Sequence, residues 1–571
     1  MVLRRALALL LCFATIGSSA SGTAWADGTL RRASAAEPAT LDPLKTAGIT
    51  ERAIVLDLFE GLATYGVDGS VVPGVATGWE VSADGRHWIF HLRHDARWSN
   101  GDPLTAEDFV YTLRRLFDPE TAAPNAIGLA VIVNAKEILS GQEKDLSRLG
   151  VQAPDPFTLT IDLREPMPFL PSVLVGNAPP VNRKAIEAHG AQWTRPGNIV
   201  TNGAFVLAEW TPQAQVVLKK NSFYYGADQV QLDEVRWIVA EDSAASLKRY
   251  RAGEIDVSSV PPPDLDYVRG AYPGELHQSP EIAVEYLVFN LRVEPFASNP
   301  KLREALALVI DRDTLNGKVD PAGQVSTVSF VPPFGTEYRP QVPAYMAIPA
   351  AERLARARAL MAEAGYPPGK PLKLTAIYHT DRFVKKRLLS IAAMWKEALG
   401  VDLAIQNREW QVWLSALREG DFQLSWDSLT SDIPEASDFM SGYRTGSGEL
   451  NDAGYSDPAF DKLMDEAQAQ TDPHQRTGLL ERAERQLLDD VPLVPLDNPV
   501  TATLVSPPRY RLAGQFHRPA SLALFRDQTG ELTAPFFPAR LICKGSLAAI
   551  VGNGFVNARS ARDRFTRLTR R

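Results

Sequence analysis

The sequence predicts an α/β protein that folds into at least two lobes. The chain has 571 residues, which is more than one hydrophobic core usually serves. From about residue 283 onward, amphipathic helical segments alternate with short strands, a pattern typical of an α/β lobe. Closer to the N-terminus, a hairpin is followed by a tight turn and a well-capped helix.

The first 26 residues have the pattern of a secretory signal peptide. An arginine pair at 4–5 precedes an apolar run at 6–16, and an A-x-A cleavage site follows at 24–26. The apolar run is too short to favour a membrane anchor. Cys12 lies inside this run without a small residue before it, so we do not expect a lipoprotein. We expect the mature protein in the periplasm.

Charge and cysteine content narrow the range of partners. Removing the two arginines at 4–5 changes the formal net charge from −8 to −10. Such an acidic chain argues against nucleic acid or anionic lipid as partner. Only Cys12 and Cys543 are present, so the mature chain is expected to hold no internal disulfide.

Residues 98–119 form the clearest local element. The letters SNGDP suit a tight turn in which Gly101 is free to take a positive φ. Thr105 and Asp108 fit a capping box, and apolar residues then recur at helical spacing up to Phe117. Before the turn, strands at 79–81 and 87–93 are predicted to form a hairpin.

The other elements are predicted from periodicity and from helix-stop residues. A strand followed by a turn is predicted at 37–43, and further strands at 158–163 and 401–405. The predicted helices cover 300–310, 349–364 before Gly365, 382–399 before Gly400, and 473–488 after the cap at Asp472.

Motifs for catalysis are missing from the sequence. It contains no H-E-x-x-H, G-x-S-x-G, P-loop or C-x-x-C pattern. His87, His91 and His94 cluster, but strand alternation puts His94 on the opposite face, so we expect scaffold roles rather than a metal site. We expect no catalytic residue, no metal and no cofactor.

A long, ordered set of motifs resembles one known family. The motifs are LFEGL, DG, PG, FHLR, W-S-x-G-x-P-x-T-A-x-D-F-V-Y and DPxTAxP between residues 58 and 124, and PGNIVTNGAF at 196–205. They resemble the periplasmic oligopeptide-binding proteins of ABC importers. The resemblance implies a fold like that of type II periplasmic binding proteins, with two α/β lobes that close about a hinge. One lobe is then discontinuous and carries an extra small domain.

The resemblance also implies domain boundaries. We expect a discontinuous lobe I, an extra domain II, a lobe III and a basic extension. They are assigned to residues 27–59 with 185–282 and 500–539 for lobe I, 60–184 for domain II, 283–499 for lobe III and 540–571 for the extension. The extension carries eight basic residues and one acid. We expect it to be solvated and poorly ordered rather than an arm for nucleic acid or membrane; a gene-model artefact is the alternative.

Several residues match positions that contact ligand in this family. Asp432 matches an aspartate that pairs with the α-ammonium group of the peptide, and Glu435 matches a family glutamate. Trp410 matches a tryptophan that walls a side-chain pocket, and Tyr286 matches a cleft tyrosine. The segment at Gly48 and Ile49 matches the one that pairs with the peptide backbone. Without the resemblance, a surface loop is the favoured reading of Asp432, and core packing is an equal alternative for the two aromatic residues.

Other positions depart from the family. The lysine, arginine and histidine that face the peptide carboxylate in the family correspond to Asp320, Trp426 and Val384, and we keep Trp426 as a candidate ligand-binding residue. The family's disulfide cysteines correspond to Ala283 and Thr430. Asn125 stands where a tyrosine is expected. The contacts that hold the carboxyl end of a ligand are therefore expected to differ from those in the family.

The favoured function is capture of oligopeptides between the lobes and their delivery to the permease subunits of an ABC transporter. A monomer is expected. The alternative is the same fold with another ligand, namely a murein peptide, dipeptide, nickel chelate, haem or sugar. A secreted hydrolase is disfavoured because the catalytic motifs are missing.

Overall fold

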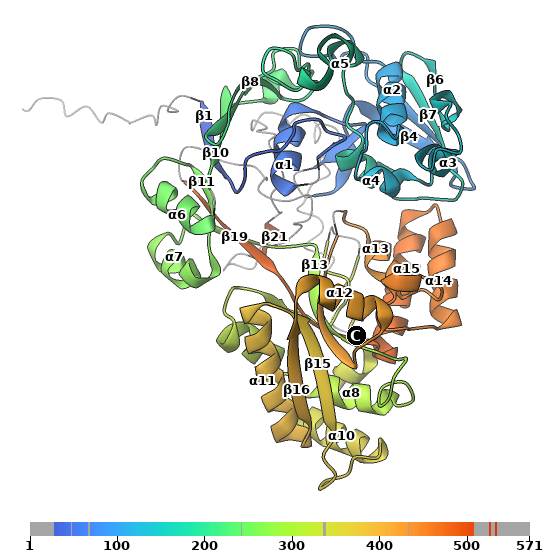
Figure 1. Cartoon of the computed structure of the whole chain (residues 1–571), viewed down its shortest axis with the longest axis vertical. Coiled ribbons are helices and arrows are strands. Elements are labelled where there is room, and N and C mark those ends of the chain that lie inside the picture. The colour runs from blue at the N-terminus through green and yellow to red at the C-terminus, as the bar shows by residue number, and fades with distance from the viewer. Residues whose placement is uncertain are drawn as a thin grey trace, which may run out of the picture.

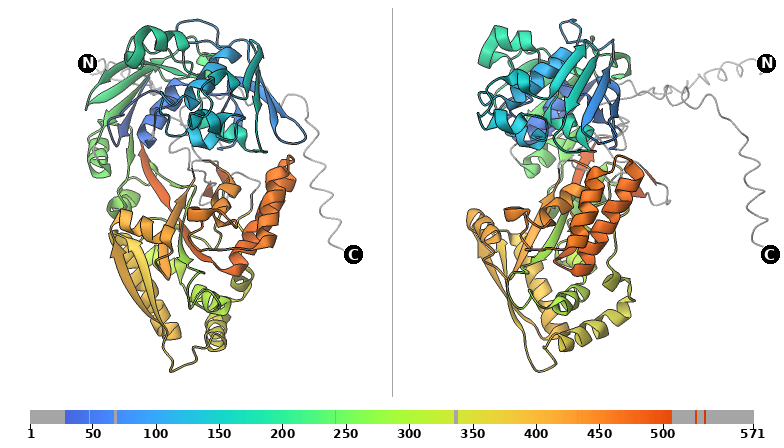
Figure 2. Two further views of the ribbon diagram at one scale, coloured as in Figure 1. Left: turned by 45° about the vertical axis from the view of Figure 1, so that its right-hand side comes forward. Right: turned by 90° about the vertical axis from the view of Figure 1, so that its right-hand side faces the viewer.

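The computed structural model describes residues 28–46, 48–66, 69–240, 242–334, 338–431 and 433–506, and the backbone of 525–526 and 532–533. The predicted signal peptide and the basic extension lie outside these residues. The elements form two bodies, an upper one coloured mainly blue to green and a lower one coloured mainly yellow to orange (Figures 1 and 2). Among the described residues, no helix combines the length and the apolarity needed to cross a membrane.

A mixed seven-stranded sheet forms one part of the upper body. β1 pairs in parallel with β10 and β11, and the remaining pairs are antiparallel. In sheet order the strands are β12 (Leu276–Pro280), β19 (Val500–Val505), β11 (Val257–Ser259), β1 (Thr29–Ser34), β10 (Glu234–Val239), β9 (Gln215–Lys220) and β8 (Phe205–Thr211). The helices from these chain regions are α1 (Ile49–Leu58), α6 (Ser243–Arg251) and α7 (Leu265–Ala271).

An antiparallel four-stranded sheet forms the other part of the upper body (Figure 1). Its order is β4 (Ala76–Val81), β5 (His87–Leu92), β7 (Thr158–Asp162) and β6 (Val151–Asp155). The accompanying elements are α2 (Ala106–Phe117), α3 (Ala135–Leu139), α4 (Leu170–Asn177), α5 (Arg183–His189) and the small hairpin of β2 (Ala63–Tyr65) and β3 (Val71–Pro73).

The lower body is built on a six-stranded sheet (Figure 1). Its order is β14 (Val325–Ser326), β18 (Leu493–Asn498), β13 (Ala283–Phe289), β17 (Leu424–Thr430), β15 (Lys373–His379) and β16 (Asp402–Arg408). The helices are α8 (Pro300–Leu308), α9 (Arg312–Thr314), α10 (Ala350–Glu363), α11 (Arg382–Leu399), α12 (Trp410–Glu419), α13 (Ala436–Met440), α14 (Pro458–Ala469) and α15 (Pro473–Asp490). A separate pair, β20 (Phe525–Arg526) and β21 (Leu532–Thr533), follows.

Most of the predicted elements are confirmed. The hairpin and helix around residues 79–118 are present, and the Thr105 N–H donates to Asp108 at 2.8 Å as a capping box requires. α11 ends at Gly400, whose φ of 71° closes the last turn. The strand predicted at 37–43 is wrong, because β1 ends at Ser34. Glu37 instead accepts hydrogen bonds from the chain at 210–213, which hold this segment without strand pairing.

Two strands that lie side by side join the two bodies. β12 of the upper sheet leads through two residues into β13, and β18 leads through one residue into β19. The Glu281 N–H donates to the Pro499 carbonyl at 2.8 Å, and the side-chain amide of Asn498 donates to the Ala283 carbonyl at 2.8 Å. Two adjacent connections of this kind allow one body to rotate against the other about a hinge.

Gly203 marks a close approach of two distant segments. Its N–H donates to the Leu58 carbonyl at 2.8 Å. A Cβ at this position would lie 2.6–2.8 Å from backbone atoms of Leu58 and Phe59. Backbone atoms cannot rotate aside as a side chain can, so the end of α1 can lie against this segment only when the residue is glycine.

Gly203→Ala is therefore expected to lower the free energy of unfolding by about 1–3 kcal/mol, a typical cost of overpacking. Gly176→Ala serves as control, because a Cβ there would meet nothing within 4 Å and α4 gains helix propensity. Denaturant unfolding measures both variants. Equal stability of the two variants would contradict the close approach at Gly203.

Candidate functional site

Three helices of the lower body begin at the edge of its sheet that faces the upper body (Figure 1). β15 pairs in parallel with both β16 and β17, so the carboxyl ends of these strands share this edge. α11, α12 and α13 follow these three strands in the chain. In open α/β sheets, ligands bind outside the carboxyl ends of parallel strands. This edge is therefore the candidate site.

Acidic side chains of the chain itself occupy the N-termini of these helices. Asp381 accepts hydrogen bonds from two N–H groups in the first turn of α11, at 2.7 and 2.9 Å. Glu409 accepts two from N–H groups of α12, at 2.8 and 3.4 Å, and Glu435 accepts one from an N–H group of α13 at 2.9 Å. Helix N-termini otherwise attract anions. At these three helices, a carboxylate of the chain itself already occupies the position that an anionic ligand group would take.

Glu435 lines a cavity of about 450 Å³ between the two bodies. Its carboxylate is buried, and both oxygens accept hydrogen bonds from Arg476, at 3.0 and 2.7 Å. The ring centroid of Phe169, in the upper body, lies 5.5 Å from the guanidinium carbon of Arg476. Phe169 and Trp79 line the same cavity. The charge of Glu435 is thus neutralised within the chain, and this residue shapes the cavity wall.

Trp410 presents an aromatic surface at the start of α12. Its side chain is 48% exposed, and its ring centroid lies 5.1 Å from that of Trp413 and 5.2 Å from that of His379. Trp413 is buried, and its indole N–H donates to Ser425 at 3.0 Å. The Trp413 indole is therefore fixed in the core, and the Trp410 indole packs against it. The exposed ring is suited to stacking against an apolar or aromatic ligand group.

Tyr286 is buried in this structure. Its ring packs edge-on against Phe330 at 5.1 Å, and its hydroxyl donates to Asp427 at 2.9 Å. Burial raises the pKa of Asp427 to about 7, and the nearby Asp452 carboxylate acts in the same direction. Tyr286 therefore lies in a buried, titratable cluster under the candidate site rather than on its surface.

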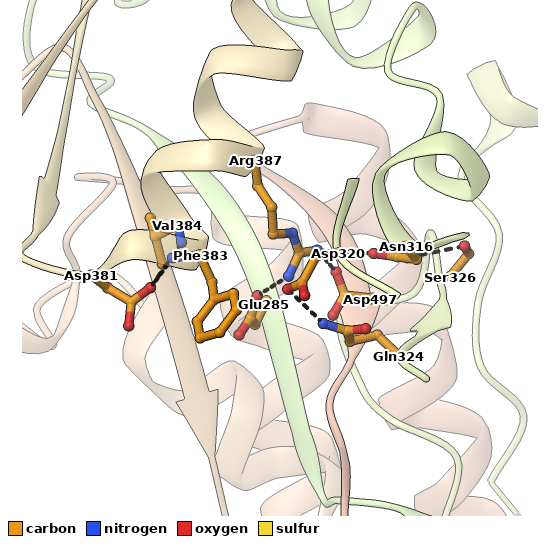
Figure 3. Close-up of polar contacts among 10 residues, drawn as sticks. All are labelled: Glu285, Asn316, Asp320, Gln324, Ser326, Asp381, Phe383, Val384, Arg387 and Asp497. Atoms are coloured by element: carbon orange, nitrogen blue, oxygen red, sulfur yellow. Dashed lines mark hydrogen bonds and ion pairs between the residues drawn. The ribbon is translucent and has the colours of Figure 1, made fainter. Parts of the chain in front are cut away.

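Three residues replace the family's contacts with the ligand carboxylate, namely Asp320, Trp426 and Val384. In the structure they lie around Arg387. The ring of Trp426 lies 4.7 Å from the guanidinium carbon of Arg387, and Val384 precedes Arg387 by one helical turn. Asp320 is buried nearby and acts electrostatically on the same guanidinium group (Figure 3). Arg387 is itself paired with Glu285 and Asp497. The structure thus brings these positions together around a cation that is already neutralised.

Other predicted residues are placed as follows. Gly48 is the N-cap of α1, and Ile49 is its first residue, with a side chain 48% exposed. Asp432 lies outside the described residues. β13 and β17 place Ala283 directly opposite Thr430. His87 lies 2.6 Å from Asp162 and His91 lies 3.0 Å from Glu80, whereas His94 packs on Phe157.

Arg387, Glu285, Asp497 and Asp427 were missed by the sequence analysis. A signal for two of them exists. Arg387 falls on the apolar face of α11 between Val384 and Ile391, and Glu285 interrupts an otherwise apolar strand. A charge on a buried face indicates either an internal ion pair or a site.

Comparison with known proteins places these features in a family. The family described as bacterial extracellular solute-binding proteins, family 5 middle, matches residues 70–451. The periplasmic oligopeptide-binding protein OppA of Escherichia coli is 37% identical over 484 residues, which cover 84% of this chain and 88% of OppA.

Two solved structures differ in how well they superpose. The unliganded open form of MppA, a periplasmic murein tripeptide-binding protein, is 35% identical, covers 84% of this chain and 93% of its own, and has a TM-score of 0.80. Haemophilus influenzae OppA in complex with the peptide RPPGFSPFR is 33% identical, covers 84% and 95%, and has a TM-score of 0.61. Sequence identity and coverage are similar for the two structures. The higher TM-score with the open form therefore indicates that the two bodies of this chain are arranged as in that form.

Asp427→Asn is expected to make stability less dependent on pH. The folded-state pKa of about 7 lies above the ordinary value of 3.8, so folding takes up a proton between these pH values. The stability due to the protonated carboxyl is complete below about pH 4 and is lost as the pH rises through 7. At pH 8 the variant should exceed the parent protein in unfolding free energy by on the order of 2–4 kcal/mol.

Thermal unfolding at pH 4.5 and pH 8 measures this difference. The control is Asp421→Asn, because this acid lies just before β17 and is exposed. An Asp427→Asn effect of the same size at both pH values would contradict the assignment.

Proposed function

Because the chain belongs to the bacterial extracellular solute-binding proteins of family 5, we propose that it captures oligopeptides between its two bodies and delivers them to the permease of an ABC importer. OppA of E. coli, to which it is similar, is named a periplasmic oligopeptide-binding protein. The observation that carries the proposal is the pair of adjacent strands that joins two bodies in an open arrangement. A ligand that contacts both bodies stabilises the closed state, and a permease can then recognise that state.

The roles of individual residues are part of the proposal. Asp432 pairs with the α-ammonium group of the peptide, and the segment at Gly48 and Ile49 bonds to its backbone. Trp410 walls a pocket for a ligand side chain, supported by the exposed ring described above. Main-chain hydrogen bonds then supply affinity that tolerates varied sequences, with bridging waters around the side chains.

The organisation of the chain follows from the same proposal. Residues 1–26 act as a cleaved signal, and the mature protein works as a monomer in the periplasm. The seven-stranded sheet belongs to the discontinuous lobe I, the four-stranded sheet to domain II and the six-stranded sheet to lobe III. The two adjacent crossing strands are the hinge between lobe I and lobe III.

A murein peptide is the second candidate ligand. The chain is 35% identical over 475 residues to MppA of E. coli, which is named a periplasmic murein peptide-binding protein, and this similarity supports the second candidate. Competition of a murein tripeptide against ordinary tripeptides of equal length distinguishes the two ligand classes.

Tri- to pentapeptides with a free amino end are expected to stabilise the mature protein after bound ligand has been stripped by partial unfolding. Micromolar affinity at millimolar ligand stabilises by about 4 kcal/mol. The same peptides with N-acetyl groups should give little shift, because a desolvated carboxylate needs its ammonium partner. Thermal unfolding with Asp432→Asn as a matched variant measures both effects. Absence of a shift with every peptide would rule out this ligand class.

Trp410→Ala is expected to weaken peptide binding by about tenfold or more while leaving the melting temperature of the free protein nearly unchanged. The side chain is half exposed, so its loss opens no cavity in the core. Trp413→Ala is the contrasting variant, since loss of a buried indole should destabilise the fold by about 3–5 kcal/mol. Calorimetric titration and thermal unfolding separate the two. Unchanged affinity in Trp410→Ala would exclude its role in the site.

A further inference from the structure

The two bodies touch each other at a second place besides the crossing strands. The turn between β4 and β5, in the upper body, lies against the turn between α14 and α15, in the lower body. A Cβ added to Gly85 in the first turn would lie 3.6 Å from Cγ2 of Thr471 in the second turn. The same Cβ would lie 3.0 Å from Cβ of Pro166, so the chain before α4 takes part in this contact.

Arg476 of the lower body extends this contact. Its guanidinium group donates to both oxygens of Glu435, at 3.0 and 2.7 Å, so it belongs rigidly to the lower body. The ring centroid of Phe169, in the upper body, lies 5.5 Å from its guanidinium carbon. A guanidinium group over an aromatic ring is an attractive contact that does not require the exact geometry of a hydrogen bond. The contact between Arg476 and Phe169 can therefore shift without being lost.

Buried apolar side chains also continue from one body into the other. Tyr65 and Val175 of the upper body belong to the same buried cluster as Phe439 and Leu480 of the lower body. The hydrophobic effect favours the removal of such surfaces from water and has no preferred direction. Separation of the bodies here would expose this apolar surface to water, whereas a tilt of one body against the other can keep it covered.

The cavity of about 450 Å³ beside this contact leaves room for such a tilt. Trp79 and Phe169 line it from the upper body, and Phe334 and Tyr338 line it from the lower body. Protein interiors are normally packed with few voids larger than a water molecule. A cavity of this size at the contact therefore allows the two surfaces to change their angle before their side chains overlap.

The second contact lies away from the crossing strands. In Figure 1, α13 and α15 are to the right of β13 and β19. Two bodies that stay joined at two separate places can rotate only about the line through both places. Leu388 of α11 and Leu480 of α15 belong to different buried clusters, because these helices cover opposite faces of the six-stranded sheet. The start of α11 is therefore displaced from the line and moves when the bodies rotate about it.

We propose that the contact of the β4–β5 turn and residues 166–169 with the starts of α13 and α15 is a second pivot, which persists while the bodies rotate. Together with the crossing strands, it confines the motion to one axis. The bodies then close over the start of α11 without separating at α15. This inference rests on the proposed function and specifies the motion by which a ligand is enclosed.

Reversible cross-linking of the second pivot tests the proposal. Pro166→Cys and Thr471→Cys are combined with Cys543→Ser, because Cys543 is the only cysteine after residue 26. A short, reducible bis-thiosulfonate reagent joins the two introduced thiols in the stripped, ligand-free protein. The joined protein should bind tri- to pentapeptides with an affinity within about twofold of that measured after reduction. Small-angle X-ray scattering should show the same decrease in radius of gyration on peptide binding before and after reduction.

The outcomes separate this inference from the proposed function. An affinity about tenfold weaker in the joined protein, restored by reductant, would show that the contact has to open and would overturn the proposal. Failure to join the two thiols in a variant that melts at the temperature of the parent protein would also overturn it. The single variants Pro166→Cys and Thr471→Cys, treated with the same reagent, are the matched controls. Binding of no peptide before cross-linking would overturn the proposed function and this inference with it.

Discussion

The structure depends on one constraint, the mutual hydrogen bonding of two strands that cross from one sheet into the other. β12 with β13 and β18 with β19 carry the chain between the bodies in opposite directions, and each crossing finds its partner in the other. A single crossing would leave unpaired backbone groups at the junction. Because the pairing is kept through the junction, the bodies can change their angle without losing sheet structure. The candidate site lies at the edge that such a rotation opens and closes.

Electrostatics at this edge are arranged by the chain before any ligand arrives. The helix N-termini are occupied by Asp381, Glu409 and Glu435, and the guanidinium groups of Arg387 and Arg476 are held by carboxylates. Removing one partner from such a pair leaves an uncompensated buried charge, which costs far more than the pair contributes. The polar groups of the edge are thus fixed in place, and the aromatic platform at Trp410 remains available for contacts that tolerate varied ligands.

The sequence predicted the elements better than the contacts between them. Capping residues and glycine stops located α2 and α11 because these signals act within a few residues. The segment at 37–43 was misassigned because its hydrogen bonds go to residues more than 170 positions away. Motif resemblance identified Asp320, Trp426 and Val384 as unusual, yet it could not reveal Arg387. That residue is brought to them only when α11 packs against the sheet formed by β13, β17 and β18.

The position of β1 in the seven-stranded sheet has a consequence for how the protein is made. Its parallel neighbours β10 and β11 arrive about 200 residues later, and β19, which closes this part of the sheet, arrives near residue 500. As the chain emerges from its N-terminus, β1 therefore stays unpaired until β10 and β11 have been released, and β12, which pairs with β19 at the edge of the sheet, stays unpaired until about residue 505. Contacts of such long sequence separation form slowly, and unpaired edges favour aggregation meanwhile. Completion of the seven-stranded sheet is thus a late event, and a chain truncated before residue 500 cannot complete it because it lacks β19.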